Sequence, residues 1–224
     1  MSRQRGWKAA FKRALDFSCA AFALLLLWPV ILVVAIAIRL VMGSPVLFRQ
    51  PRPGKGGRIF HINKFRSMMP PQASDGRPLS ETERVTWLGR LLRATNVDEL
   101  PQLWNILIGD MSLVGPRPLL PQYLSRYTPR QARRHEVTPG LTGLASVKGR
   151  NLLSWEEKLE FDVEYVDSWS ICLDFKILIL TAVKVMTNEG GRPANGATVE
   201  EFLGSARSAS GDDARSIDDS RHEN

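Results

Sequence analysis

The sequence predicts an α+β protein: a small, mostly helical cytosolic domain with short strands, on an N-terminal re-entrant membrane helix and interfacial amphipathic helices. Residues 17–38 form an uncharged run with Pro29 near its middle, and such a run is long enough for a membrane helix. The remainder mixes short helical and strand-like patterns. It lacks the βαβ alternation that builds a large parallel sheet.

Composition excludes several classes of protein. The 224 residues are 44% hydrophobic and 24% charged, which is ordinary for a folded chain. Two cysteines exclude a disulfide scaffold and a Cys-rich zinc module, and the three histidines are too dispersed to form a metal-ligand cluster. The mean hydropathy of −0.14 excludes a multi-pass membrane protein but leaves room for one membrane segment.

The formal charge of +7 is concentrated near the N-terminus. Residues 1–66 hold twelve basic side chains and one acid, residues 67–188 are balanced, and residues 189–224 carry four arginines against eight acids. A basic excess beside an apolar run predicts attraction to anionic lipid head groups. We therefore divide the chain into a basic collar with a membrane helix (1–42), a folded domain (43–188) and a disordered acidic tail (189–224).

Two features favour a re-entrant helix over an ordinary span. Pro29 removes one helix hydrogen bond and clashes with the carbonyl group of Leu25, which predicts a break there. Both flanks of the run are basic, and basic flanks favour the cytoplasmic side, so both ends belong on one side. The alternative is a kinked helix that spans once, because proline is tolerated inside membranes.

Local signals predict a hairpin and two loops after the anchor. Residues 46–50 and 58–65 have strand character, and the Pro- and Gly-rich segment between them predicts a turn. We interpret residues 54–57 as part of that turn rather than as a phosphate-binding loop, because the Walker spacing is absent. Residues 115–118 and 138–143 are predicted to be rigid loops.

Apolar spacing predicts two helices in the middle of the chain. One covers residues 81–93. The other begins near Asp98, with Pro101 in its first turn and Gly109 at its end.

Further helices are predicted towards the C-terminus. Ser154 and Glu157 form a capping box that opens a helix reaching residue 168. Residues 169–186 are largely apolar and fit either a core helix or a helix in the membrane interface.

Asp98 and Glu99 stand side by side at a predicted helix start. Two adjacent carboxylates suit a Mg²⁺ ion, and Arg93, Arg117 and Arg150 are candidates to surround them. Acids, a hard metal ion and arginines together indicate the handling of a phosphate ester. The alternative is that the acids only cap a helix and the arginines lie on a solvated face.

Ordered motifs run from residue 12 to residue 186. Besides Pro29 they are KRALD (12–16), GSPV (43–46), RPG (52–54), KFRSM (64–68), DELPQLWN (98–105), GDMSLVGPRP (109–118), PGLTG (139–143), GRN (149–151), FD (161–162) and YVD (165–167). In these motifs the chain resembles the monotopic bacterial phosphoglycosyl transferases, the initiating sugar transferases of glycan assembly. It is most similar to small single-domain members such as the bacillosamine-phosphate transferase.

The resemblance implies that residues 43–188 are a catalytic domain with Asp98 as nucleophile. Asp98 is expected to attack the β-phosphate of a UDP-sugar, release UMP and form a covalent aspartyl-phosphosugar intermediate. A polyprenol phosphate (undecaprenyl phosphate) then accepts the phosphosugar, as the first membrane step of glycoconjugate or exopolysaccharide assembly. Glu99 is expected to bind Mg²⁺ with Asp98 or to act as a base, and Mg²⁺ is the expected cofactor.

Five basic residues are candidates for substrate binding: Arg93, Arg117, Arg150, Lys64 and Arg66. Attraction to the lipid surface explains Lys64 and Arg66 at least as well as substrate contact does. The expected partners are a UDP-sugar, a polyprenol phosphate and membrane lipid, but no nucleic acid. The expected location is the bacterial inner membrane with the catalytic domain facing the cytoplasm, and a homo-oligomer is left open.

Two other functions stay open on the sequence. One is a membrane-anchored scaffold that binds anionic lipid without catalysis, and the other is a glycosyltransferase that releases UDP. The adjacent acids favour the transferase over the scaffold. The family pattern is altered at Asn96, at Thr138 and at residues 144–147, which leaves the donor sugar open; resemblance alone favours a UDP-N-acetylated amino sugar.

Overall fold

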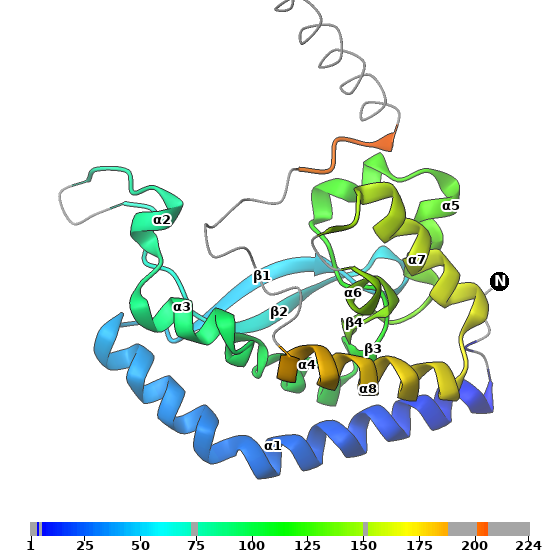
Figure 1. The fold of residues 1–224 in the computed structure, drawn as a ribbon, viewed down its shortest axis with the longest axis horizontal. Coiled ribbons are helices and arrows are strands. Elements are labelled where there is room, and N and C mark those ends of the chain that lie inside the picture. The colour runs from blue at the N-terminus through cyan, green and yellow to red at the C-terminus, as the bar shows by residue number, and fades with distance from the viewer. Residues whose placement is uncertain (1–3, 5, 73–75, 150–151, 188–200, 206–224) are drawn as a thin grey trace, which may run out of the picture.

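In the computed structural model, which describes residues 4, 6–72, 76–149, 152–187 and 201–205, a long N-terminal helix lies along one side of a mixed domain (Figure 1). The α-helices are α1 (Trp7–Val41), α2 (Glu81–Arg84), α3 (Trp87–Ala94), α4 (Gln102–Ile108), α5 (Pro129–Ala132), α6 (Leu144–Lys148), α7 (Trp155–Ser168) and α8 (Ile171–Thr187). The strands are β1 (Leu47–Pro53), β2 (Ile59–Phe65), β3 (Ser112–Val114) and β4 (Gly140–Thr142). Short 3₁₀ helices cover Lys55–Gly57, Val97–Glu99, Pro121–Arg126 and Arg133–Glu136.

The strands form two small sheets, which confirms the mixed α+β class. β1 and β2 pair antiparallel with Leu47 opposite Phe65, as the predicted hairpin requires. β3 and β4 pair in parallel. Each sheet has two strands among the described residues, so the absence of βαβ alternation correctly excluded a large parallel sheet.

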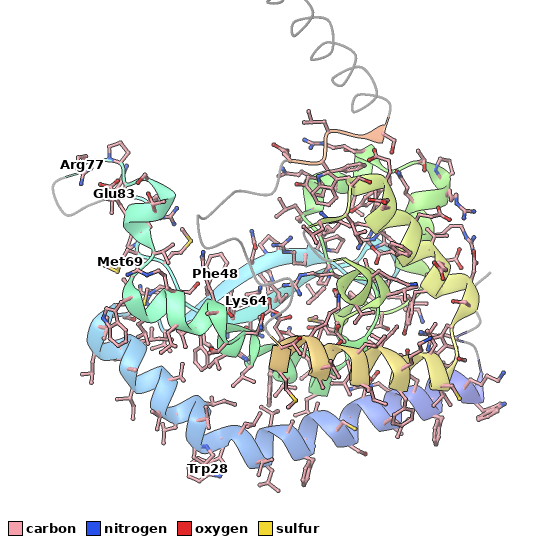
Figure 2. All side chains as sticks on the ribbon, viewed as in Figure 1. Trp28, Phe48, Lys64, Met69, Arg77 and Glu83 are labelled. Carbon is pink, nitrogen blue, oxygen red and sulfur yellow. The ribbon has the colours of Figure 1, made fainter. Side chains whose placement is uncertain are left out.

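Helix α1 is one element of 35 residues that continues through Pro29. It bends in its middle, where Trp28 points away from the domain (Figures 1 and 2). Its apolar window has a mean hydropathy of 2.9 and is 6% buried, so the helix is long and apolar enough to cross a membrane. Pro29 therefore accompanies a bend inside a continuous helix and does not end the helix.

Both arms of α1 pack on the domain. The first arm places Ala20 against Leu103 and Ile106 of α4. The second arm places Ile38 in a cluster with Phe65 of β2 and Leu88 of α3. The concave side of the bend is therefore covered by protein (Figure 1), and the convex side presents large apolar side chains.

The single helix predicted over residues 81–93 is wrong, because the chain breaks at Val85. Val85 is extended, and the hydroxyl of Thr86 accepts a hydrogen bond of 3.0 Å from the backbone N–H of Gly89. This side-chain cap starts a new helix. Gly89 packs so closely that an added Cβ would lie 2.0 Å from the carbonyl oxygen of Ser67, so α3 can rest directly on the chain that follows β2.

The other helix signals hold. The capping box of Ser154 and Glu157 opens α7, and Gly109 ends α4 in the left-handed conformation with φ of 96°. In α8, which covers the apolar segment at 169–186, Asp174 and Ile177 are the buried residues. The rest of this helix is partly or fully exposed.

Most of the predicted tail, at residues 189–200 and 206–224, lies outside the described residues. The exception is the segment 201–205, and it differs from the disorder that we predicted. Phe202 is 1% exposed and joins a cluster with Tyr123 and Leu159.

Candidate active site

The two adjacent carboxylates lie in the 3₁₀ helix Val97–Glu99, which joins α3 to α4. Asn96 precedes them in the left-handed conformation, with φ of 56°, and Asn is one of the few residues that adopt it readily. The left-handed conformation at Asn96 changes the direction of the chain between α3 and the 3₁₀ helix. In the resulting position Asp98 is 5% exposed. Asp98 and Glu99 thus precede α4 by one short turn and do not lie within it.

An asparagine ties this turn to the hairpin. Asn105 of α4 is fully buried. Its amide nitrogen donates to the carbonyl group of His61 at 2.8 Å, and its Oδ1 accepts from the backbone and side-chain nitrogens of Asn63, both at 3.0 Å. These three hydrogen bonds hold α4 against β2 and bring Lys64, the next residue of β2, towards Glu99.

Glu99 is held by two cations from distant parts of the chain. Lys64 Nζ lies 2.7 Å from Glu99 Oε1. Arg117, in the loop after β3, donates to both carboxylate oxygens, at 2.5 Å to Oε1 and 3.4 Å to Oε2. The side chain of Glu99 is 14% exposed, whereas that of Arg117 is 43% exposed, so the pair is open on the arginine side.

The electrostatics keep Glu99 ionised. Burial raises the pKa of its carboxyl group, but Arg117 and Lys64 outweigh burial and hold the pKa well below its usual range. Burial and Arg117 lower the pKa of Lys64, while Glu99 opposes that shift. The two carboxylates and the two cations form a site whose charges balance.

A second arginine holds the loop that carries Arg117. Arg134 is 2% exposed, and its Nη2 donates to the carbonyl group of Arg117 at 2.6 Å. The same guanidinium pairs with Asp162 of α7 at 2.7 Å and donates to the hydroxyl of Tyr127 at 3.1 Å. Asp162 therefore has a structural role, because it holds the arginine that supports the Arg117 loop.

Glycines allow the two rigid loops to cross beside this arginine. An added Cβ at Gly115 would lie 2.4 Å from the carbonyl oxygen of Thr138, and one at Gly143 would lie 2.3 Å from that of Gly115. Only glycine permits such an approach of two backbones. The crossing places the Arg117 loop next to β4.

The other predicted binding residues have different surroundings. Arg93 of α3 donates from Nε to the hydroxyl of Ser67 at 2.9 Å, and it stands five residues before Asp98 in the chain. Arg66 donates to the carbonyl groups of Met42, Gly43 and Ser44, so it ties down the end of α1. Arg150 lies outside the described residues.

The donor set suits a magnesium ion that also binds a substrate. Among the described residues no group of three or more His, Cys, Asp or Glu side chains could hold a metal ion, so a closed protein cage is absent from that part of the chain. Magnesium binds through one or two carboxylates and completes its shell with water and phosphate oxygens. Asp98 and Glu99 fit this open kind of site.

Spacing along the sequence did not reveal Asn105 and Arg134 as supports of the site. Asn105 falls inside the DELPQLWN motif, and its distance of seven residues from Asp98 was the available signal. Arg134 precedes the rigid loop at 138–143. It lies in a run of four residues, Arg133–Glu136, of which three are charged and one is histidine. Such a run usually indicates a solvated face.

The site thus holds a buried and a partly buried carboxylate, two facing cations and a long apolar helix beside them. The bacterial sugar transferase family matches residues 7–188, and the chain belongs to this family. That match confirms the resemblance of the sequence motifs to the initiating sugar transferases.

Individual relatives agree with the family. The chain is 52% identical over 194 residues, or 87% of its length and 96% of the relative, to an uncharacterized sugar transferase, EpsL, of Bacillus subtilis. It is 41% identical to the UDP-glucose:undecaprenyl-phosphate glucose-1-phosphate transferase of Caulobacter vibrioides, covering 80% of this chain and 70% of that one. A transferase of the same name from Klebsiella pneumoniae is 39% identical and is covered over 42% of its length.

Proposed function

We propose that this protein transfers a phosphosugar from a UDP-sugar to undecaprenyl phosphate and releases UMP, with Asp98 as the nucleophile. The observation that carries the proposal is the placement of two adjacent acids beside two cations. Glu99 pairs with Lys64 and Arg117, and Asp98, the residue before it, is 5% exposed and interacts electrostatically with both cations. A carboxylate nucleophile divides a difficult transfer into two easier steps.

The proposed chemistry balances in two displacements. An Asp98 oxygen bonds to the β-phosphorus of the UDP-sugar while the bond from that phosphorus to the bridging oxygen breaks, and the oxygen leaves with UMP. A phosphate oxygen of undecaprenyl phosphate then bonds to the same phosphorus. The acyl-phosphate bond breaks, and the Asp98 carboxylate is regenerated.

Glu99 acts in this scheme by organising charge. A general base works best with a pKa near the working pH. The pKa of Glu99 is instead held well below its usual range, and therefore farther from neutral pH. The acceptor phosphate is largely ionised at neutral pH, because the second pKa of a phosphate monoester is about 6. The second step therefore does not need Glu99 to remove a proton, and Glu99 instead fixes Lys64 and Arg117.

Magnesium is the cofactor that the charge balance favours. The two acids are already matched by Lys64 and Arg117, so a diphosphate would bring negative charge without compensation. When bound by Asp98 and Glu99, Mg²⁺ would neutralise the diphosphate and stabilise charge that develops on the leaving oxygen. Arg93 and Arg117 are the side chains proposed to orient the phosphates.

The donor sugar is proposed from the relatives. Several are named for glucose-1-phosphate transfer from UDP-glucose, and one is named for N-acetylgalactosamine. UDP-glucose is therefore the first donor to test, with UDP-N-acetylated amino sugars beside it.

The test is to quantify both nucleotides. Purified protein receives Mg²⁺, undecaprenyl phosphate and one UDP-sugar at a time, with EDTA and lipid-free controls. We expect UMP with one donor, in amounts that require the lipid and the metal. UDP in place of UMP would mean that the sugar moves alone and that the phosphosugar scheme is wrong.

We also propose that α1 enters and leaves the membrane on the cytoplasmic side of the bacterial inner membrane. Its first end is tied to the domain by Lys12, which pairs with Asp174 of α8 at 2.7 Å, and by Asp16, which accepts from the backbone N–H of Leu113 at 3.0 Å. Its last end is tied by the three hydrogen bonds of Arg66. A spanning helix would place these ends on opposite faces of the bilayer, where one small domain cannot hold both.

Three further helices support attachment in the membrane interface. Each exposes large apolar side chains four residues apart: Trp87 and Leu91 on α3, Trp104 and Ile108 on α4, and Phe175, Ile179 and Val183 on α8. These helices lie on the side of the domain that faces α1 (Figure 1). Tryptophan is enriched at membrane–water interfaces, so we propose that α3, α4 and α8 lie at the surface of the same leaflet.

Cysteine labelling tests this topology. In a variant whose Cys19 and Cys172 are replaced by serine, Lys8→Cys and Ser44→Cys are both expected to react with an impermeant reagent from the cytoplasmic face only. Labelling of the two positions from opposite faces would contradict the re-entrant arrangement. Adding Pro29→Leu is expected to straighten α1 and favour the opposite-face pattern.

A further inference from the structure

A short segment near the C-terminus docks on parts of the domain that are distant from it in the sequence. Glu201–Ser205, coloured orange in Figure 1, lies near α5 and α7. The ring of Phe202 packs against Tyr123, Trp155 and Tyr127, with ring centroids 5.6, 5.5 and 5.8 Å away. Burial of a phenylalanine side chain is favourable, so this contact anchors the segment on the domain.

Polar contacts fix the register of the segment. Arg126 pairs with Glu201 at 2.8 Å and also donates to the carbonyl group of Phe202. Gln131 donates to the hydroxyl of Ser205 at 2.6 Å. Between them Gly204 adopts a φ of 101°, a conformation that other residues adopt only with strain. The segment is thus held at both ends and turned in the middle.

The docked ring is connected to the catalytic acids by direct contacts. Phe202 stacks on Tyr127, whose hydroxyl accepts from Arg134. Arg134 donates to the carbonyl group of Arg117, and the Arg117 side chain pairs with Glu99. The partly buried Leu119 and Leu120, which follow Arg117, pack against the same aromatic cluster.

We propose that Glu201–Ser205 is an intramolecular strap that holds the Arg117 loop (residues 115–120) in position for chemistry at Asp98 and Glu99. Phe202 is then a positioning residue, because it acts on the site through Tyr127, Arg134 and Arg117. The effect of the strap on turnover rests on the proposed function, whereas its effect on the loop does not.

Hydrogen exchange tests the loop independently of activity, since local opening sets the exchange rate of protected amides. Full-length Phe202→Ala is compared with Leu203→Ala, a matched change at the neighbouring, 55% exposed side chain. In Phe202→Ala the amides of Gly140 and Tyr123, which donate to the carbonyl groups of Pro116 and Leu120 in the Arg117 loop, are expected to exchange about tenfold faster, and in Leu203→Ala at the wild-type rate. Wild-type exchange in both variants would overturn the proposal.

Kinetics and rescue separate positioning from general destabilisation. Phe202→Ala is expected to lower kcat about tenfold with little change in the KM for UDP-sugar, since small displacements of site groups cost rate. A synthetic peptide with the sequence of residues 199–207 should restore both kcat and the slow exchange, and the same peptide with alanine in place of phenylalanine should not. An unchanged kcat, or a peptide without effect, would overturn the proposal.

Two controls keep the test decisive. If Phe202→Ala does not fold, Gly204→Val replaces it, because that change strains the strap and leaves the aromatic cluster intact. If the wild type releases no UMP with any donor, the proposed function fails, and the exchange experiment still decides whether the strap orders the loop.

Discussion

Two arginine–carboxylate pairs lie next to each other in this protein and differ in their access to solvent. In the pair of Arg134 with Asp162, the side chains are 2% and 6% exposed, whereas in the pair of Arg117 with Glu99 they are 43% and 14% exposed. The closed pair holds the backbone of the open one, because Arg134 donates to the carbonyl group of Arg117. A buried charge pair therefore does not by itself indicate a catalytic site.

The surroundings of the two acids explain the difference in role. Burial raises the pKa of Asp162, although Arg134 opposes this shift. The charged form of Asp162 is therefore stabilised by one cation, Arg134. Glu99 has two cations, and together they keep its pKa low. The closed pair is suited to rigidity and the open pair to contact with an anionic substrate, and each of the following changes tests this division.

The largest effect is expected at Asp98. Asp98→Asn removes the nucleophile and should lower turnover by about a thousandfold or more, while the thermal unfolding midpoint stays near that of the wild type. UMP release and a thermal melt measure the two properties. A fully active Asp98→Asn variant would show that another group carries the chemistry.

The next effect is expected at Glu99. Glu99→Gln leaves Lys64 and Arg117 without their shared anion and should lower kcat about a hundredfold, as loss of one preorganised electrostatic contact does. The control is Glu160→Gln, which removes an exposed acid paired with Arg130 on the surface. Equal activity in the two variants would reduce Glu99 to a structural acid.

The closed pair should affect stability first. Arg134→Leu leaves Asp162 buried without its cation, and breaking such a pair costs about 3–5 kcal/mol. Arg134→Leu combined with Asp162→Leu should recover most of the free energy of unfolding, because no charge is then left unpaired. It should not recover full activity, since the bond to the Arg117 carbonyl group is still missing. Full recovery of both properties would contradict the supporting role of Arg134.

A smaller, pH-dependent effect is expected at His135, beside the closed pair. Burial and then Arg134 lower the pKa of His135 to about 4, whereas the pKa of histidine in an unfolded chain is about 6.5. Between these values the unfolded chain binds the extra proton, so stability falls as the pH drops from about 6.5 towards 4. His135→Gln should weaken that fall in the unfolding midpoint. An unchanged pH profile would exclude His135 as its source.

Local signals in the sequence predicted much of the fold. Gly109 and the capping box at Ser154 act within a few residues, so their outcome depends little on the rest of the chain. The break at Val85 was missed because the apolar spacing favours one helix, whereas the Thr86 cap starts another. The packing of Phe202 was missed because the residues around it are Gly-, Ser- and acid-rich, a composition typical of disorder.

The site could be predicted only in part for a similar reason. The motif residues Asp98 and Glu99 were identified from their adjacency and from family resemblance. The pairing of Glu99 with Lys64 joins residues that are 35 positions apart. It depends on Asn105 holding α4 to β2, and no local pattern in the sequence indicates such a tertiary contact. Arg66 shares a motif with Lys64, yet it points to the end of α1.

The most direct test of the central claim is a single turnover without the lipid acceptor. Wild-type protein is mixed with Mg²⁺ and the UDP-sugar that supports turnover, and its intact mass is measured together with UMP. We expect about one UMP per active protein, a mass increase of one phosphosugar on Asp98, and loss of that mass when undecaprenyl phosphate is added. UMP release that requires the acceptor, with no mass change at Asp98, would contradict a covalent intermediate.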